Sequence, residues 1–133
     1  PSQRENRLTD LVTDTSGLRN NSIVSLKNSW HWNVQTKECK FSDAWCESLG
    51  YDPHEIRHHE STWRDLVHPE DMEKVYKVLE PHLEGRTSSY KCRNRLRMKS
   101  GLYRWNMDYG KVTERDAKGQ AVIMEGYDIT IAS

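Results

Sequence analysis

Side chains alternate in kind at every position from residue 90 to residue 99. Tyr, Cys, Asn, Leu and Met fill the even positions, and Lys or Arg fills every odd one. Side chains that share a face of a β-strand repeat every second residue, so this segment predicts a strand with one buried and one solvated face. A turn signal follows at Ser100-Gly101, and aromatic residues then alternate with polar ones from Tyr103 to Tyr109. The pattern predicts an antiparallel hairpin.

The alternation predicts which face of this hairpin is buried and which is exposed to solvent. In the second strand the apolar row includes Trp105, which we expect to be buried and to anchor the sheet to the helices. The lysines and arginines of the first strand are expected to form a solvated face, cross-paired with Asp108 and Glu114. Binding of an anionic partner is the alternative for this cationic row.

Similar patterns indicate the neighbouring elements. Trp30 and Trp32 alternate with polar residues ahead of a polar turn and a second short run ending at Phe41, which predicts another hairpin. Ser42 is a favourable N-cap for a short helix after that hairpin. A further long strand is expected over residues 121–131.

The strongest helix signal begins at Pro69, which suits the first helical position. Asp71 is expected to support this start by accepting a hydrogen bond from the N–H of His68. The order of elements predicts an α+β domain, with a single antiparallel sheet of about five strands and with short helices and one longer helix on one face. Residues 1–27 are expected to form an N-terminal helical lead-in to a domain over 28–133.

Charge and composition narrow the class of protein. The 133 residues include 20 basic and 20 acidic side chains, so no net field draws the chain to nucleic acid. No run approaches the roughly 18 apolar residues of a membrane span. Three cysteines without a CxxC pair favour a reducing compartment. We therefore expect a folded cytoplasmic domain with no nucleic-acid partner and no membrane contact.

Several motifs occur in an order that resembles a PAS domain with its C-terminal PAC segment. They are Gly-Tyr-x-Pro at residues 50–53, His-Pro-Glu-Asp at 68–71, Gly-x-Tyr-Arg-Trp at 101–105 and Asp-Ile-Thr at 128–130. The resemblance extends over about residues 28–131. It implies the PAS fold and a sensory and dimerisation module of a bacterial signal-transduction protein.

The resemblance also implies partners. We expect a homodimer, with a downstream output domain in the same chain that is a histidine kinase or a GGDEF-type diguanylate cyclase. The full-length protein would then be a signalling enzyme, in some cases tethered to a membrane, whereas these residues themselves contain no catalytic set. The signal is expected to leave through Asp128, Ile129 and Thr130, because Asp and Thr can cap a helix that follows the strand.

An aromatic set is expected to form the core and to leave room for a small, unidentified ligand where the sheet curves around the helices. Asn94 stands where the family often has an aromatic residue and would make the pocket wall more polar. The candidate pocket residues are Trp45, Trp63, Tyr90, Asn94, Trp105 and Tyr127.

A second function is suggested by His54-Glu55-Ile56-Arg57-His58, which matches the HExxH pattern. In zinc-dependent hydrolases the two histidines bind zinc from one helical turn apart, and the glutamate acts as general base. The segment has little apolar periodicity and no third ligand motif follows, so a surface position is favoured and no metal site is expected. The zinc hydrolase remains the alternative function.

The remaining candidates for cofactor binding are His68, His82 and Cys46. His68 is better explained as a helix cap before Pro69, and His82 as part of a helix whose apolar face lies elsewhere, which disfavours haem. Cys46 lies in Ala-Trp-Cys-Glu, which does not match the Asn-Cys-Arg-Phe-Leu-Gln segment of flavin-binding light sensors. A photochemical flavin adduct is therefore not supported.

Overall fold

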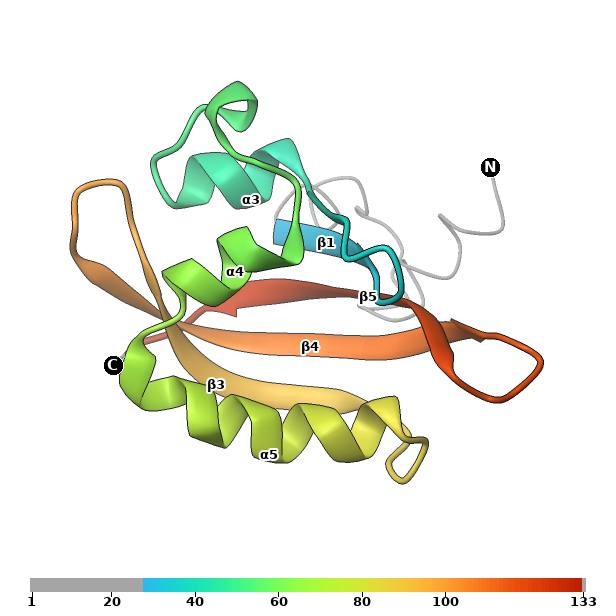
Figure 1. The fold of residues 1–133 in the computed structure, drawn as a ribbon. Coiled ribbons are helices and arrows are strands. Elements are labelled where there is room, and N and C mark those ends of the chain that lie inside the picture. The colour runs from blue at the N-terminus through green and yellow to red at the C-terminus, as the bar shows by residue number, and fades with distance from the viewer. Residues whose placement is uncertain (1–27, 133) are drawn as a thin grey trace, which may run out of the picture.

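The computed structural model describes residues 28–132, so the predicted lead-in over 1–27 lies outside the described residues. Five antiparallel strands form one sheet in the order β2-β1-β5-β4-β3. Figure 1 shows α3 and α4 over this sheet and α5 running beside β3. The elements are β1 Asn28–Asn33, β2 Cys39–Phe41, α3 Asp43–Ser48, the 3-10 turn η1 Pro53–Glu55, α4 Glu60–Leu66, the 3-10 turn η2 Pro69–Asp71, α5 Met72–Leu83, β3 Tyr90–Arg97, β4 Tyr103–Arg115 and β5 Ala121–Thr130.

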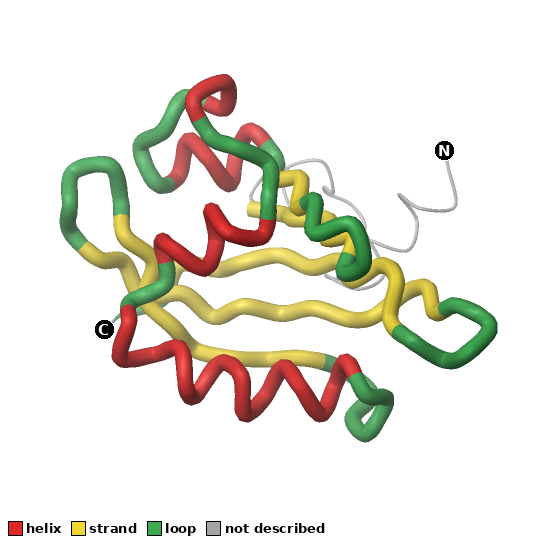
Figure 2. Tube along the Cα trace, viewed as in Figure 1, coloured by secondary structure: helices red, strands yellow, loops and turns green. Residues whose placement is uncertain are grey.

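The predicted α+β architecture is confirmed, and the core lies between the helices and one face of the sheet (Figure 2). Helix α3 is built as its sequence indicates. The hydroxyl of Ser42 accepts a hydrogen bond from the Trp45 N–H at 3.1 Å, and Gly50 takes a φ of 92° just after the helix. This short helix buries Trp45 and Cys46 in the core, and its C-cap residue Leu49 is buried with them.

The start of the long helix differs from the prediction. Residues Pro69–Asp71 form a 3-10 turn, and it is the His68 ring that caps it by accepting from the Glu70 N–H at 3.1 Å. The carboxylate of Asp71 instead accepts from the backbone N–H of Arg95 at 2.8 Å and from its guanidinium at 2.7 Å. The predicted Asp71 cap is wrong, because this carboxylate joins the turn to strand β3.

The prediction of which β4 residues face the core is also wrong. Asp108 lies directly opposite Cys92, and Trp105 lies directly opposite Arg95. Opposed residues of antiparallel strands share a face, so Asp108 points toward the helices and Trp105 points away from them. Trp105 is half-buried on the outer face, with the Arg93 guanidinium 4.1 Å from its ring centroid. Asp108 is buried and does not pair with the cationic row as expected.

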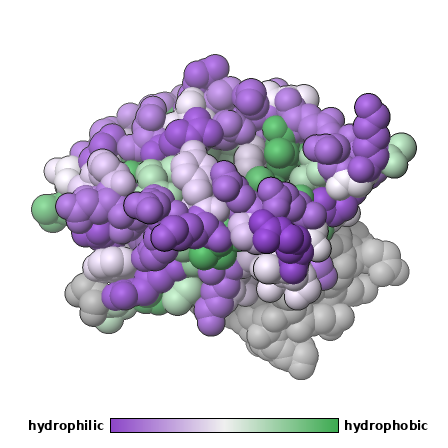
Figure 3. Space-filling model, turned by 60° about the horizontal axis from the view of Figure 1, so that its bottom comes forward, coloured by the Kyte–Doolittle hydropathy of each residue, from purple (hydrophilic) through white to green (hydrophobic). Residues whose placement is uncertain are grey.

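Most of the described surface in the view of Figure 3 is hydrophilic, with hydrophobic side chains confined to small separate spots. Within residues 28–132, no helix has the length and apolar character needed to cross a membrane.

Candidate functional site

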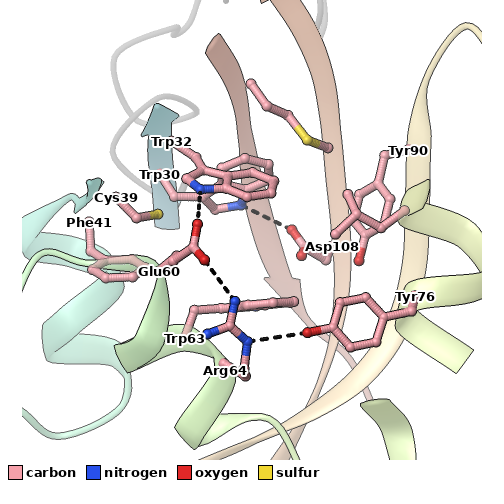
Figure 4. A pocket seen from close by; sticks show the side chains of 12 residues that line it. Trp30, Trp32, Cys39, Phe41, Glu60, Trp63, Arg64, Tyr76, Tyr90 and Asp108 are labelled. Carbon is pink, nitrogen blue, oxygen red and sulfur yellow. Dashed lines mark hydrogen bonds and ion pairs between the residues drawn. The ribbon is translucent and has the colours of Figure 1, made fainter. Parts of the chain in front are cut away.

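A cavity of about 60 Å³ lies between the sheet and helices α4 and α5 (Figure 4). Its exposed wall is almost entirely apolar. Every strand and both of these helices contribute side chains to it. The wall is made of Trp30, Trp32, Cys39, Phe41, Glu60, Trp63, Arg64, Tyr76, Leu79, Tyr90, Asp108 and Met124.

Two glycines position the Trp30 indole on the sheet. Gly126 of β5 lies opposite Trp30 of β1, and Gly110 of β4 lies opposite Gly126. A Cβ atom at Gly110 would lie 2.6 Å from the indole, and one at Gly126 would overlap both the indole and the Tyr109 carbonyl oxygen. The absence of side chains at both positions therefore lets the ring lie against the backbone.

A pair of buried carboxyl groups lies beneath this ring. Asp108 accepts a hydrogen bond from the Trp30 indole at 3.0 Å, and Asp128 accepts one from the Trp45 indole at 2.8 Å. Burial raises the pKa of Asp108, and the adjacent Asp128 carboxylate raises it further. Burial also raises the pKa of Asp128. The pair therefore favours a shared proton over two negative charges.

At its solvent side the cavity is bordered by a polar network centred on Glu60. This carboxylate accepts from the Trp32 indole at 3.0 Å and from the Arg64 guanidinium at 2.8 Å. Arg64 also donates to the Tyr76 hydroxyl at 3.2 Å, so the network links β1, α4 and α5 (Figure 4). Burial opposes ionisation of Glu60, but the hydrogen bonds from Arg64 and Trp32 outweigh it and lower the pKa. Glu60 is thus an anion at neutral pH.

Several buried polar atoms on the inner side of the sheet have no hydrogen-bond partner among the described residues. Such atoms are few in native proteins, and each calls for an explanation. They are Tyr90 Oη, both amide atoms of Asn94, Arg104 Nη2, Asn106 Nδ2 and Asp128 Oδ1.

Of the six predicted pocket residues, the structure brings two to the cavity, Trp63 and Tyr90. Trp45 and Asn94 are buried on the same side of the sheet but do not line the cavity. Trp105 and Tyr127 lie on the outer face, where Tyr127 stacks on Tyr109 with centroids 5.1 Å apart.

Sequence reasoning missed the other wall residues for different reasons. The alternation of Trp30 and Trp32 placed both on one face of a strand, which was a usable signal for the cavity wall. Glu60, Arg64 and Tyr76 had no such signal, because they meet only when α4 packs beside α5.

The three predicted output residues differ in whether their side chains are buried or exposed. The Asp128 side chain points inward and accepts a hydrogen bond from the Trp45 indole. Ile129, which is 47% exposed, and Thr130 lie at the exposed end of β5. Their role in output stays a prediction.

The HExxH segment is not a helix. Glu55 ends the 3-10 turn η1, accepts the Asp52 N–H at 2.7 Å and pairs with Lys99 at 3.0 Å. The His58 ring accepts the Phe41 N–H at 3.1 Å. Across residues 28–132, no three His, Cys, Asp or Glu side chains come together in a metal-binding arrangement. The geometry that a zinc hydrolase needs is therefore missing from this segment.

His82 is buried as a structural residue. Its Nε2 accepts the Val112 N–H at 2.9 Å and its Nδ1 lies 3.0 Å from the Thr87 carbonyl oxygen. Both ring nitrogens therefore have partners in the protein, and this histidine joins α5 to β4 and to the loop before β3.

The cavity is small beside the sites that hold large ligands. Sites for drug-sized ligands have volumes of roughly 300–1,000 Å³, far above the about 60 Å³ found here. Cys39 is the cysteine on the cavity wall, and burial raises its pKa, so it is a thiol. Burial likewise raises the pKa of Cys46, to about 11.

The PAS fold family matches residues 38–128 of the chain. A sensory box histidine kinase/response regulator from Burkholderia thailandensis is similar, with a TM-score of 0.70 and 27% identity over 81% of this chain and 79% of that one. The N-terminal domain of a diguanylate cyclase with PAS/PAC sensor from Marinobacter aquaeolei has a TM-score of 0.67 and 23% identity, over 78% of this chain and 94% of that one.

A light-oxygen-voltage domain, described with a flavin analogue, has a TM-score of 0.61 and 19% identity, over 89% of this chain and 90% of that one. At these identities the cyclase and light-oxygen-voltage likenesses show the fold alone. Among curated proteins, none is similar enough in sequence to count as a relative.

Proposed function

The chain belongs to the PAS family, and on that premise we propose that it is the sensory module of a bacterial signal-transduction protein, with the cavity as its ligand site. The observation that carries this proposal is the Glu60 network at the cavity border. It joins β1, α4 and α5, so an occupant that displaces it changes how the two helices lie against β1.

A route from the cavity to the end of the domain runs through the sheet. Trp32 on the cavity wall belongs to β1, and β1 pairs with β5 from Asn28↔Asp128 to Asn33↔Ile123. Strand β5 ends at Thr130, next to the exposed Ile129. A shift of β1 against β5 would therefore reach the connector to a downstream domain, which is the kind of small displacement that signalling proteins amplify.

The output domain is proposed to be a histidine kinase or a diguanylate cyclase, in keeping with the proteins to which the two sensor domains above belong. We further propose that the module works as a homodimer in the cytoplasm and has no catalytic activity of its own.

The test uses the full-length protein and a variant that fills the cavity. Leu79 is buried on the cavity wall, so Leu79→Phe should occupy part of the space without adding charge. The variant is expected to stay folded and to change kinase or cyclase activity at least about threefold, which corresponds to a shift of well under 1 kcal/mol in a two-state equilibrium. The control is Glu80→Ala, at the exposed neighbouring position. A folded Leu79→Phe protein with the activity of the control would contradict the proposal.

A further inference from the structure

The cavity is walled by the faces and edges of six aromatic rings, those of Trp30, Trp32, Phe41, Trp63, Tyr76 and Tyr90. In the view of Figure 4 the Trp30 and Trp32 indoles lie on one side of the space, and the Trp63 indole lies on the opposite side. The face of an aromatic ring is electron-rich and attracts a cation, most strongly for Trp. The cation–π contacts found within residues 28–132 use Trp105 and Tyr109, on the outer face of the sheet.

Fixed charges at the cavity add to this preference. Glu60 is ionised at the border, and its side chain is only 12% exposed. Asp108 lies on the wall opposite it and shares its buried position with Asp128. Arg64 is the cationic side chain on the wall, and its guanidinium is already bound by Glu60 and Tyr76. The Glu60 and Arg64 charges offset each other as an ion pair, and the Asp108–Asp128 pair with one shared proton carries a single negative charge. An anion therefore meets no unpaired cationic group on this wall, whereas a cation meets a negative charge and ring faces.

A buried hydroxyl supplies an independent sign of a ligand. Tyr90 is 2% exposed and lines the cavity, and its Oη has no hydrogen-bond partner in the described part of the chain. The Tyr90 oxygen is therefore an electronegative atom on the side of the sheet that faces the cavity.

We propose that the cavity binds a small quaternary or fully methylated ammonium compound, a proposal that rests on the ligand-sensing function above. A primary ammonium carries three N–H donors and would leave some of them without acceptors against this apolar wall, at a large desolvation cost. A quaternary ammonium has no N–H, and its methyl groups pack on aromatic rings. The volume of about 60 Å³ matches a few water-sized spheres and therefore a tetramethylammonium-sized group.

The experiment measures binding of three probes of one shape and different charge to the full chain. Choline, 3,3-dimethylbutan-1-ol and 3,3-dimethylbutanoate present a trimethylammonium group, a neutral tert-butyl group and a tert-butyl group next to a carboxylate. Titration calorimetry gives affinities, and tryptophan emission reports the site because three of the five tryptophans line the cavity. Tetramethylammonium serves as a fourth probe that lacks the hydroxyl.

Choline and tetramethylammonium are expected to bind with Kd on the order of 1 mM or below, with the neutral isostere at least about tenfold weaker and the anion without saturable binding. Glu60→Gln keeps the shape of the side chain and should weaken choline binding about tenfold while leaving the neutral isostere unchanged. The matched control is Glu73→Gln, since Glu73 is 84% exposed on the outer side of α5 and should leave all affinities unchanged.

Equal or tighter binding of the neutral or the anionic probe would overturn the ligand class, as would an absence of saturable cation binding. These outcomes are separate from the test of the sensory function. If Leu79→Phe alters output activity but no cation binds, the ligand class is wrong and the sensory function stands. If cations bind but Leu79→Phe leaves output unchanged, the cavity is a cation site without the proposed signalling role.

Discussion

Asp108 and Asp128 face each other directly across strands β4 and β5, and both carboxyl groups are buried on the side of the sheet that packs against the helices. Each is held by a different tryptophan, Asp108 by Trp30 and Asp128 by Trp45. Two carboxylates this close in a water-excluded interior cannot both ionise without a large cost. Burial raises the pKa of both groups, so the pair favours a form with one proton over a form with two negative charges.

Asp108→Asn is expected to raise the free energy of unfolding, and the gain should grow with pH. Burial and Asp128 raise the pKa of Asp108, so the folded state binds more protons than the unfolded state above the ordinary Asp value of 3.8. The free energy of unfolding of the wild type therefore falls as pH rises from about 4 toward 8. The Asn amide keeps the hydrogen bonds of the protonated acid but does not titrate, so the variant should lose this pH dependence. Urea unfolding across this range measures it.

The control for Asp108 is Asp65→Asn, at an exposed position on α4. Its unfolding free energy should follow the wild-type pH dependence. A wild-type slope retained in Asp108→Asn would show that Asp108 does not hold the proton.

Gly126→Ala is expected to cost about 3 kcal/mol or more, because the added methyl group would overlap the Tyr109 carbonyl oxygen and the Trp30 indole. Neither neighbour can move without breaking the pairing of β4 with β5 or the contact of Trp30 with Asp108. Gly101→Ala is the comparison, since nothing lies within 4 Å of a Cβ there and only the φ of 96° opposes it, at about 1 kcal/mol. Urea unfolding measures the loss of unfolding free energy in each variant. Equal losses would show that the overlap at Gly126 is not what destabilises Gly126→Ala.

Asp71→Ala is expected to destabilise the fold by about 1 to 3 kcal/mol, because it leaves the backbone N–H of Arg95 without its acceptor. Asp71 is only 4% exposed, so water does not readily replace the carboxylate. Glu70→Ala is a close control, since Glu70 is 79% exposed and contacts the same guanidinium at 3.7 Å. Thermal melts should rank Asp71→Ala well below Glu70→Ala, and identical melts would refute the role of Asp71 in joining η2 to β3.

Trp45→Ala and Trp105→Ala should differ strongly in stability. Trp45 is 1% exposed, stacks on Phe41 and donates to Asp128, so its truncation should cost about 3 to 5 kcal/mol. Trp105 is half-buried under Arg93 and Arg95 on the outer face, and its loss should cost about 1 kcal/mol. If Trp105→Ala lowers the free energy of unfolding as much as Trp45→Ala does, Trp105 contributes to stability like a core residue and its assignment to the outer face is wrong.

Much of the fold could be predicted from local patterns. Alternation over residues 90–99, the turn at Ser100-Gly101 and the N-cap at Ser42 all depend on residues that are neighbours in sequence, and the structure confirms the strands, the hairpin and the short helix that they indicate. The cap by His68 is of the same kind. Patterns of this sort are reliable because the backbone conformation and its nearest hydrogen bonds are decided within a few residues.

The candidate site could not be predicted in this way. The size of its side chain favoured Trp105 for the buried face of β4, but the register with β3 places Asp108 there instead. The Trp30 indole of β1 donates a hydrogen bond to Asp108, and the Trp45 indole of α3 donates one to its neighbour Asp128. Asp71 had a local cap available and instead binds Arg95, which is 24 residues away in the chain. The cavity, the shared proton and the Glu60 network exist only where distant segments meet, because burial and the pairing of charges depend on which elements pack together and not on the order of residues along one of them.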